Sequence, residues 1–221
     1  MAGEGVKTYT EENPKVRGGT ERGAGPPFLL EGAVAANSMG AATMRWCARA
    51  GRRASWPMLA AVRSAAVLGI DALDVTVEVD VVPGLPAWTI VGLASSAVKE
   101  ARERVSAALA NSGFDVPSRR VTVNLSPADV RKDGTSFDLP IALALLAATG
   151  ALDASRLEGL VVAGELGLDG SIRPIRGALS LARAAMRATA CLVVPEPNVA
   201  EATLTGRTRV ATAPTLTDLV Q

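Results

Sequence analysis

Two hydroxyl side chains, Thr135 and Ser136, lie where a charged loop meets a long apolar run in the sequence. The loop carries Arg131 and Lys132, and the run after it reads LPIALALLAA. A serine hydroxyl acts as a nucleophile when a base takes its proton, and arginine and lysine bind phosphate groups. This segment therefore concentrates the side chains that could do chemistry.

The residue types that are missing exclude several kinds of catalysis. Histidine is absent, which rules out Ser-His-Asp and Cys-His mechanisms and removes the commonest ligand of transition metals. The two cysteines, Cys47 and Cys191, are far apart in the sequence, so we expect neither a zinc site nor a disulfide framework. A reducing cytoplasm is the compartment that this cysteine usage favours.

Lysine usage excludes an ATP site of the Walker type. None of the four lysines follows a glycine, so the pattern GxxxxGK[ST] does not occur. We therefore expect no cofactor in this chain. No long uncharged apolar run is followed by a stop-transfer pattern, so we expect no membrane partner.

The elements around the hydroxyl pair alternate between strand and helix patterns. We predict a central buried helix after Ser136, with Thr135 or Ser136 as its N-cap and Gly150 as its end. Residues 94–111 have the apolar spacing of an amphipathic helix, and residues 75–82 and 87–91 read as a hairpin-like pair of strands. The pattern predicts an α+β fold, an α/β sandwich with helices packed on a mixed sheet.

Several separated motifs resemble one known family. The runs GLPAWTIVGLASSAVKEARERV, NLSPADVRK and DGTSFDLPIALALLAATG are similar to the N-terminal domain of the ComM/YifB family of magnesium-chelatase-like AAA+ ATPases. More distantly, KDGTSFD and GELGLDGSIRPIRGAL look like the proteolytic domain of Lon and the Lon-like domain of RadA. The resemblance begins at about Met58 and runs to the C-terminus.

The resemblance implies a fold and a set of partners. It implies the Lon-like fold that is shared with domain two of a small-subunit ribosomal protein. It also implies a ring of copies of the chain, a hexamer when joined to the AAA+ motor, that acts on DNA. ATP and magnesium would belong to the family's motor, which we expect to be absent from this chain or supplied by a separate AAA+ chain.

The Lon resemblance places Ser136 at the position of the catalytic serine. The lysine that serves as base in Lon corresponds to Leu179 in this sequence, and neighbouring arginines cannot accept a proton at neutral pH. We therefore expect no catalytic residue, and a helix-capping role for Ser136. A vestigial or active serine peptidase built on Ser136 is the alternative from the enzyme class.

Four basic residues are the candidates for nucleic-acid binding: Arg119, Arg120, Arg131 and Lys132. They would form a phosphate-binding patch if the start of the strand at 119–125 and the following loop share one edge. Acidic residues are interspersed with them, so an oligomeric scaffold without DNA affinity is the other hypothesis. For the DNA-presenting role the family resemblance implies DNA processing, in branch migration and natural transformation.

The first 57 residues differ in composition from the rest. They are rich in Gly, Pro, Ser, Thr and charge without a sustained period, which predicts disorder. A nucleic-acid arm or a targeting peptide would suit the arginines at the end of this segment. Because the family resemblance starts near Met58, we favour an extension that is not part of the natural protein, and a single domain over 58–221.

Overall fold

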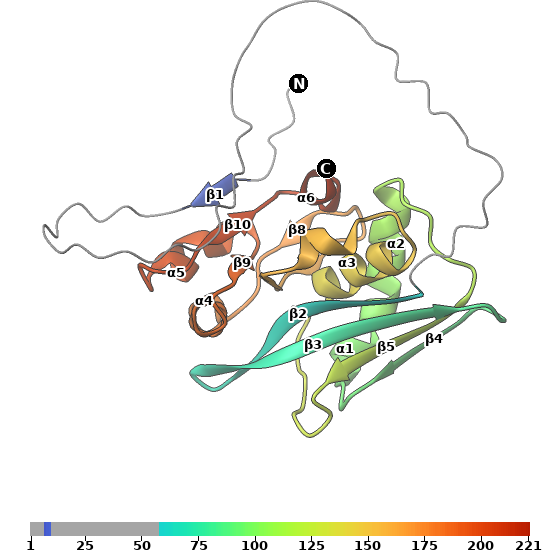
Figure 1. Ribbon diagram of the computed structural model, residues 1–221, viewed down its shortest axis with the longest axis horizontal. Helices are drawn as coiled ribbons and strands as arrows, with labels where there is room; N and C mark the ends of the chain where they lie inside the picture. The colour runs from blue at the N-terminus through green and yellow to red at the C-terminus, as the bar shows by residue number, and fades with distance from the viewer. Residues whose placement is uncertain (1–6, 10–57) are drawn as a thin grey trace, which may run out of the picture. The chain divides into compact units, whose positions relative to one another are not determined.

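The computed structural model describes residues 7–9 and 58–221. The largest sheet has the strand order β2-β3-β5-β4. Its strands are β2 (Leu59–Leu68), β3 (Asp71–Val82), β4 (Ala87–Val91) and β5 (Arg120–Ser126). Together with the helices on this sheet, the arrangement confirms the α+β prediction (Figure 1).

The pairing within this sheet corrects one prediction. β2 and β3 form a ten-pair antiparallel hairpin around Gly69, whose φ of +63° suits a residue without a side chain. β3 and β4, however, do not pair with each other. β5 lies between them, antiparallel to β3 and parallel to β4. The predicted hairpin of residues 75–82 and 87–91 is therefore wrong, and β4 takes the edge of the sheet.

A second sheet has the order β1-β10-β9-β6. Its strands are β1 (Lys7–Tyr9), β10 (Val210–Thr212), β9 (Cys191–Val193) and β6 (Leu160–Val162). β1 is antiparallel to β10, and the other pairs are parallel. Except for the β1 residues, the predictions for residues 1–57 lie outside the described part of the chain. A small hairpin of β7 (Glu165–Leu166) and β8 (Ile172–Arg173) completes the strands.

The helices follow the predicted positions closely. They are α1 (Ser96–Lys99), α2 (Ala101–Asn111), α3 (Asp138–Ala148), α4 (Ala178–Arg187), α5 (Val199–Thr203) and α6 (Leu216–Val220), with 3-10 turns η1 (Ala154–Leu157) and η2 (Glu196–Asn198). The predicted helix over 94–111 is present as α1 and α2, which meet at Glu100.

The main core lies between the large sheet and the helices α2 and α3. All residues of α3 are buried, as the apolar run after Asp138 predicts. The inward residues of β3, among them Val77 and Val79, pack with α3. Figure 1 shows α2 and α3 on the same face of this sheet. Because α3 is packed along its whole length, the position of its first residue is fixed.

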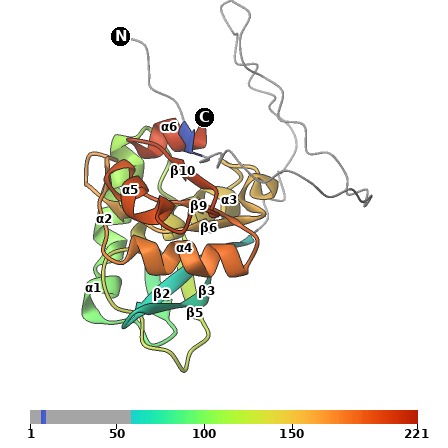
Figure 2. The same ribbon diagram turned by 90° about the vertical axis from the view of Figure 1, so that its left-hand side faces the viewer.

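A second cluster of buried residues surrounds α4. This helix contacts β2, β3 and β9 and so links the two sheets (Figure 2). Its buried residues include small ones such as Ala182 and Ala185, which allow close approach. Within residues 7–9 and 58–221, no helix is long and apolar enough to span a membrane.

Candidate functional site

A pocket of about 600 Å³ opens beside the start of α3. We call it the Ser136 pocket. Four segments that are distant in sequence form its wall: the β2–β3 turn, the loop before α3, β7 and the loop before α4. The lining residues are Val67, Gly69, Asp133, Gly134, Thr135, Ser136, Glu165, Pro174, Ile175, Arg176 and Gly177. The structure thus brings the predicted hydroxyl pair into a concave site.

The two hydroxyls do not cap α3, which corrects the sequence prediction. The N-cap residue is Phe137, and no side chain makes a capping hydrogen bond there. The Thr135 hydroxyl donates to the Glu165 carboxylate instead. The Ser136 carbonyl accepts the Gly164 N–H at 2.9 Å, which ties the loop to the segment before β7. Among the described residues, no hydrogen bond engages the Ser136 hydroxyl, so it is available to a ligand.

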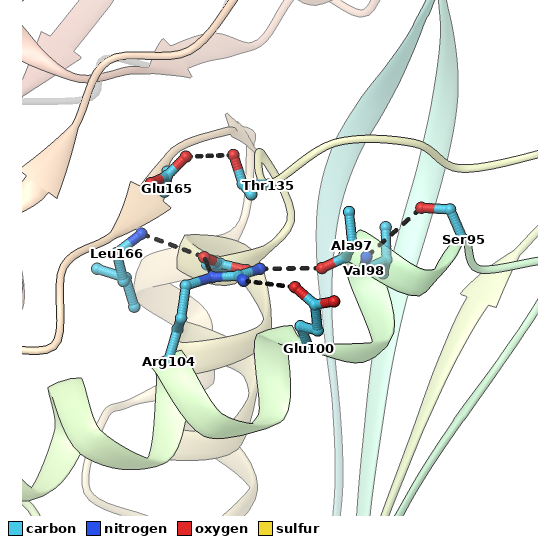
Figure 3. Close-up of polar contacts among 9 residues, drawn as sticks. Ser95, Ala97, Val98, Glu100, Arg104, Thr135, Glu165 and Leu166 are labelled. Atoms are coloured by element: carbon cyan, nitrogen blue, oxygen red, sulfur yellow. Dashed lines mark hydrogen bonds and ion pairs between the residues drawn. The ribbon is translucent and has the colours of Figure 1, made fainter.

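A buried ion pair lies behind the pocket, at the first residue of α3. Asp138 is fully buried, and Arg104 of α2 binds both of its carboxylate oxygens, at 2.6 Å and 3.0 Å. The Leu166 N–H lies 3.4 Å from the same carboxylate, and Arg104 also donates to the Ala97 carbonyl (Figure 3). This bidentate geometry is the strong form of an Arg–carboxylate contact. It joins α2, α3 and β7 at one point.

Burial and ion pairing shift the pKa values of Asp138 and Arg104 in opposite directions. Burial raises the pKa of Asp138, and the hydrogen bonds from Arg104 oppose this rise without cancelling it. The hydrogen bond to Asp138 in turn raises the pKa of Arg104 above its ordinary value. A carboxyl without solvent needs such a cation, because an isolated buried charge costs several kcal/mol or more. The ion pair therefore explains how a charged residue can begin a fully buried helix.

The opposite wall of the pocket is also held rigidly. Asn198 accepts a hydrogen bond from the Ile175 N–H at 2.9 Å and donates one to the Ile175 carbonyl at 2.8 Å. Gly177 follows with a φ of +79°, and a Cβ on it would meet Val67 at 3.0 Å. Arg176, between Ile175 and Gly177, lines the pocket and is exposed. The backbone shape of this wall thus depends on a glycine and on one buried amide.

The pocket offers hydrogen bonds and the carboxylates of Asp133 and Glu165, but not the lysine base of a Lon-type dyad. Its lining holds no lysine, and Leu179 lies in the first turn of α4, outside the lining. The Arg176 guanidinium stays protonated at neutral pH. Glu165 already accepts the Thr135 hydroxyl. The arrangement can therefore bind a polar group through hydroxyl, carboxylate and guanidinium, whereas it lacks the base of a Ser-Lys dyad.

Lys132 does not lie with the other nucleic-acid candidates on the surface. Its side chain is fully buried, and its ammonium donates to the Pro127 carbonyl. Burial lowers the pKa of Lys132, while the nearby Asp129 carboxylate acts in the opposite direction. Its backbone also bridges to Ala94, before α1. Lys132 is therefore placed to hold the loop closed and not to contact phosphate.

The three arginines of the candidate set are exposed but occupy two places. Arg119 and Arg120 lie at the start of β5, whereas Arg131 follows its end. At about 3.3 Å per residue the length of β5 separates these places by about 20 Å. Arg131 also pairs with Asp133, with its Nε 3.0 Å from a carboxylate oxygen. The structure does not assemble one patch from the four candidates.

A second concave surface lies beside the edge strand β4. We call it the β4 groove; it measures about 630 Å³. Its lining residues are Trp88, Thr89 and Ile90 of β4 and Ser96, Lys99, Glu100, Arg102 and Glu103 of α1 and α2. Arg120 pairs in register with Ala87, so it lies close to one end of this groove. The four charged residues of the lining are two bases and two acids.

Sequence reasoning missed the Arg104–Asp138 pair and the β4 groove. A signal for the first exists: an aspartate that starts a wholly apolar helix must find a buried cation. The sequence contains no comparable signal for the β4 groove, because the edge position of β4 follows from the insertion of β5 and not from any motif.

The sequence comparisons agree with this arrangement of motifs. A family model described as "Subunit ChlI of Mg-chelatase" matches residues 77–198, a range that includes both α3 and the loop before α4. The chain is 48% identical over 143 residues to "Uncharacterized protein YifB" of Salmonella typhimurium, which covers 65% of this chain and 28% of that protein. It is 44% identical over 163 residues to "Competence protein ComM" of Haemophilus influenzae, 74% of this chain and 32% of that protein.

A third relative is "Uncharacterized protein Rv2897c" of Mycobacterium tuberculosis, with 43% identity over 142 residues, or 64% of this chain and 28% of that protein. The matches span less than one third of the length of these relatives. The matched range holds most of the Ser136 pocket and the whole β4 groove. The chain belongs to the family of Mg-chelatase subunit ChlI, together with the ComM and YifB proteins.

Proposed function

We propose that this chain is a non-catalytic domain of a ComM/YifB-type AAA+ protein, and that it serves assembly. The observation that carries the proposal is the Ser136 pocket, whose serine hydroxyl has no hydrogen-bond partner among the described residues and whose lining contains no lysine. Leu179, whose side chain cannot accept a proton, occupies the sequence position that the Lon resemblance gives to the catalytic lysine. A pocket that lacks this base suits a domain that binds partners instead of cleaving them.

The wider role follows from the relatives. One of them is named as a competence protein, which supports a role in handling incoming DNA during transformation. In this proposal the ATPase activity, with its ATP and magnesium, resides in an AAA+ module outside this chain. The domain would help to arrange copies of the protein, as a ring, in the cytoplasm.

DNA contact is a second candidate function, and one observation favours it. Exposed Arg119 and Arg120 adjoin the β4 groove, which holds Lys99, Arg102 and a half-buried tryptophan. Two observations weigh against it. Glu100 and Glu103 line the same groove, and residues 58–221 carry 15 Lys and Arg against 17 Asp and Glu. A net negative domain is poorly suited to non-specific phosphate binding. We therefore place the scaffold role first.

The peptidase alternative is tested with an unstructured protein substrate. We expect no cleavage by the purified chain at any pH from 6 to 9, and no difference between the wild type and Ser136→Ala. A matched control is Ser155→Ala, at an exposed serine in η1 outside the pocket. Turnover that disappears in Ser136→Ala but persists in Ser155→Ala would refute the non-catalytic proposal.

The DNA candidate is tested by fluorescence anisotropy with a branched DNA and a linear duplex at two salt concentrations. The scaffold role predicts no binding to either DNA at low salt. DNA presentation instead predicts salt-dependent binding that weakens in the double variant Arg119→Ala, Arg120→Ala. Arg207→Ala with Arg209→Ala is the matched control, because these arginines are also exposed but precede β10 in the other sheet.

A further inference from the structure

Strand β4 has the properties of an unprotected sheet edge. Its sequence is AWTIV, with no charge and no proline inside the strand, and with residues of high β-propensity. Natural edge strands are usually protected from pairing by lysine, proline or a bulge. On one side β4 pairs with β5, and among the described residues no strand pairs with its other side. A row of backbone donors and acceptors is thus open to a further strand.

The open side faces a space that a strand could enter. The β4 groove runs between this strand and the helices α1 and α2. The ends of β4 are sharply defined, because Pro86 precedes it and Gly92 and Leu93 follow with φ values of +97° and +55°. An incoming strand would therefore pair over the length of β4 and no further.

The charges around the groove indicate which kind of partner could bind there. Lys99 and Arg102 are balanced by Glu100 and Glu103 on the same helical surface. A two-fold interface brings each surface against its own copy, so a patch with equal numbers of both signs can satisfy itself. A nucleic acid or a strongly charged peptide would find as many repulsive as attractive partners there. A second copy of this chain is the occupant that the charge pattern fits.

The sequence of β4 also suits pairing with itself. Antiparallel pairing about a two-fold axis at Thr89 places Trp88 opposite Ile90 of the second copy, twice. It also places the two Thr89 residues opposite each other and Ala87 opposite Val91. Aromatic with β-branched pairs and Thr–Thr pairs are both stabilising in antiparallel sheets. No pair in this register joins two charges.

We propose that two copies of this chain associate through β4, so that the two large sheets become one continuous eight-stranded sheet. This inference goes beyond the proposed ring, because a two-fold interface closes between two copies and does not itself build a ring. The pairing of two short strands buries little area, so the association is weak and depends on concentration.

The test is analytical ultracentrifugation of the full chain over a wide concentration range. We expect a monomer–dimer equilibrium for the wild type and a loss of about tenfold or more in association constant for Thr89→Lys, since like charges directly opposite repel. Thr89→Glu should show the same loss. An equal mixture of the two variants should recover the dimer, because Lys and Glu then face each other across the axis.

Thr122→Lys is the matched control. Thr122 pairs in register with Thr89 and is half-buried, but it lies on the internal strand β5. We expect this variant to dimerise like the wild type, with circular dichroism confirming that all variants fold. A monomeric wild type, or a dimer that Thr89→Lys leaves intact, would overturn the inference. A mixture that stays monomeric would overturn the proposed register.

These outcomes separate the inference from the proposed function. Self-association that is insensitive to Thr89 would refute pairing through β4 but leave the assembly role in place. Cleavage activity that depends on Ser136 would refute the non-catalytic role, whatever the oligomeric state.

Discussion

Arg102 and Arg104 lie two residues apart on α2, yet they belong to two different regions of the molecule. Arg104 is 19% exposed and binds a fully buried carboxylate, Asp138. Arg102 is 52% exposed, and its nearest carboxylate is that of its neighbour Glu103, at 3.5 Å. Arg104 belongs to the framework behind the Ser136 pocket, and Arg102 belongs to the rim of the β4 groove.

The difference between these arginines shows how little a charge run reveals by itself. In the sequence, both belong to the charged face of one amphipathic helix. In the structure, Arg104 pairs with a buried carboxylate 34 residues away in the sequence, whereas Arg102 stays on the surface. Only surface charges can contact a partner, so we expect partners at the β4 groove. The buried pair instead stabilises the framework beside the Ser136 pocket.

The largest expected effect comes from removing the buried cation. Arg104→Met leaves the Asp138 carboxylate buried without its partner, and we expect a loss of about 4 kcal/mol in the free energy of unfolding. Urea denaturation at pH 7 measures it. Arg102→Met is the control and should change stability by about 0.5 kcal/mol or less. Equal losses in the two variants would erase the distinction between the two regions.

The second prediction tests whether the region of β4 is held by backbone contacts instead of by charge. A Cβ at Gly92 would lie 2.1 Å from the Leu125 carbonyl oxygen, and its φ is +97°. We expect Gly92→Ala to cost about 3 kcal/mol, because overpacking adds to backbone strain. Gly69→Ala, with a φ of +63° but no atom of the described residues within 4 Å of the Cβ, should cost only the strain, about 1 kcal/mol. Similar losses would contradict the close contact.

The pH dependence of the Arg104→Met variant sharpens the comparison further. Because burial raises the folded pKa of Asp138 above its unfolded value, the stability this group contributes is present in acid and is lost as pH rises through the folded pKa. Arg104 lowers that pKa, so its removal moves the loss to higher pH. The stability gap between wild type and variant should therefore shrink as pH falls from 7 to 4, as denaturation at several pH values would show. A gap independent of pH would mean that the lost contacts are not electrostatic.

The smallest effect is expected at the ion pair between Arg131 and Asp133. Their side chains are 72% and 61% exposed, so solvent screens the attraction. Arg131→Ala should change the free energy of unfolding by about 0.5 kcal/mol or less, and 1 M salt should not alter the variant's stability relative to the wild type by more than that. A loss comparable to that of Arg104→Met would show that exposed pairs also belong to the framework.

Much of the fold could be predicted from local patterns. The apolar run after Ser136 predicts the buried helix α3, and the spacing of apolar residues over 94–111 predicts α1 and α2. These features depend on the periodicity of neighbouring residues, which the sequence displays directly. The membership of the ComM/YifB family rests likewise on contiguous motifs.

The errors arose where distant segments meet. The insertion of β5 between β3 and β4 cannot be read from either strand, because both have the pattern of a hairpin partner. The hydroxyls of Thr135 and Ser136 suit an N-cap, but the segment at Gly164 and Glu165 takes the loop's hydrogen-bonding groups instead. Lys132 has the sequence environment of a surface residue, and only the fold of its loop buries it.

The order of strands in the large sheet has a consequence for how the chain folds. β2 and β3 are joined by a tight turn, so they can pair as soon as that turn forms, a process of about 1–10 μs in isolated hairpins. The parallel pairing of β4 with β5 requires that the intervening segment, which contains α1 and α2, first brings the two strands together. The pairing of β3 with β5 spans the same two helices, so β4 and β5 both join after the hairpin has formed. During synthesis of the protein, β4 would therefore stay unpaired until β5 has been made.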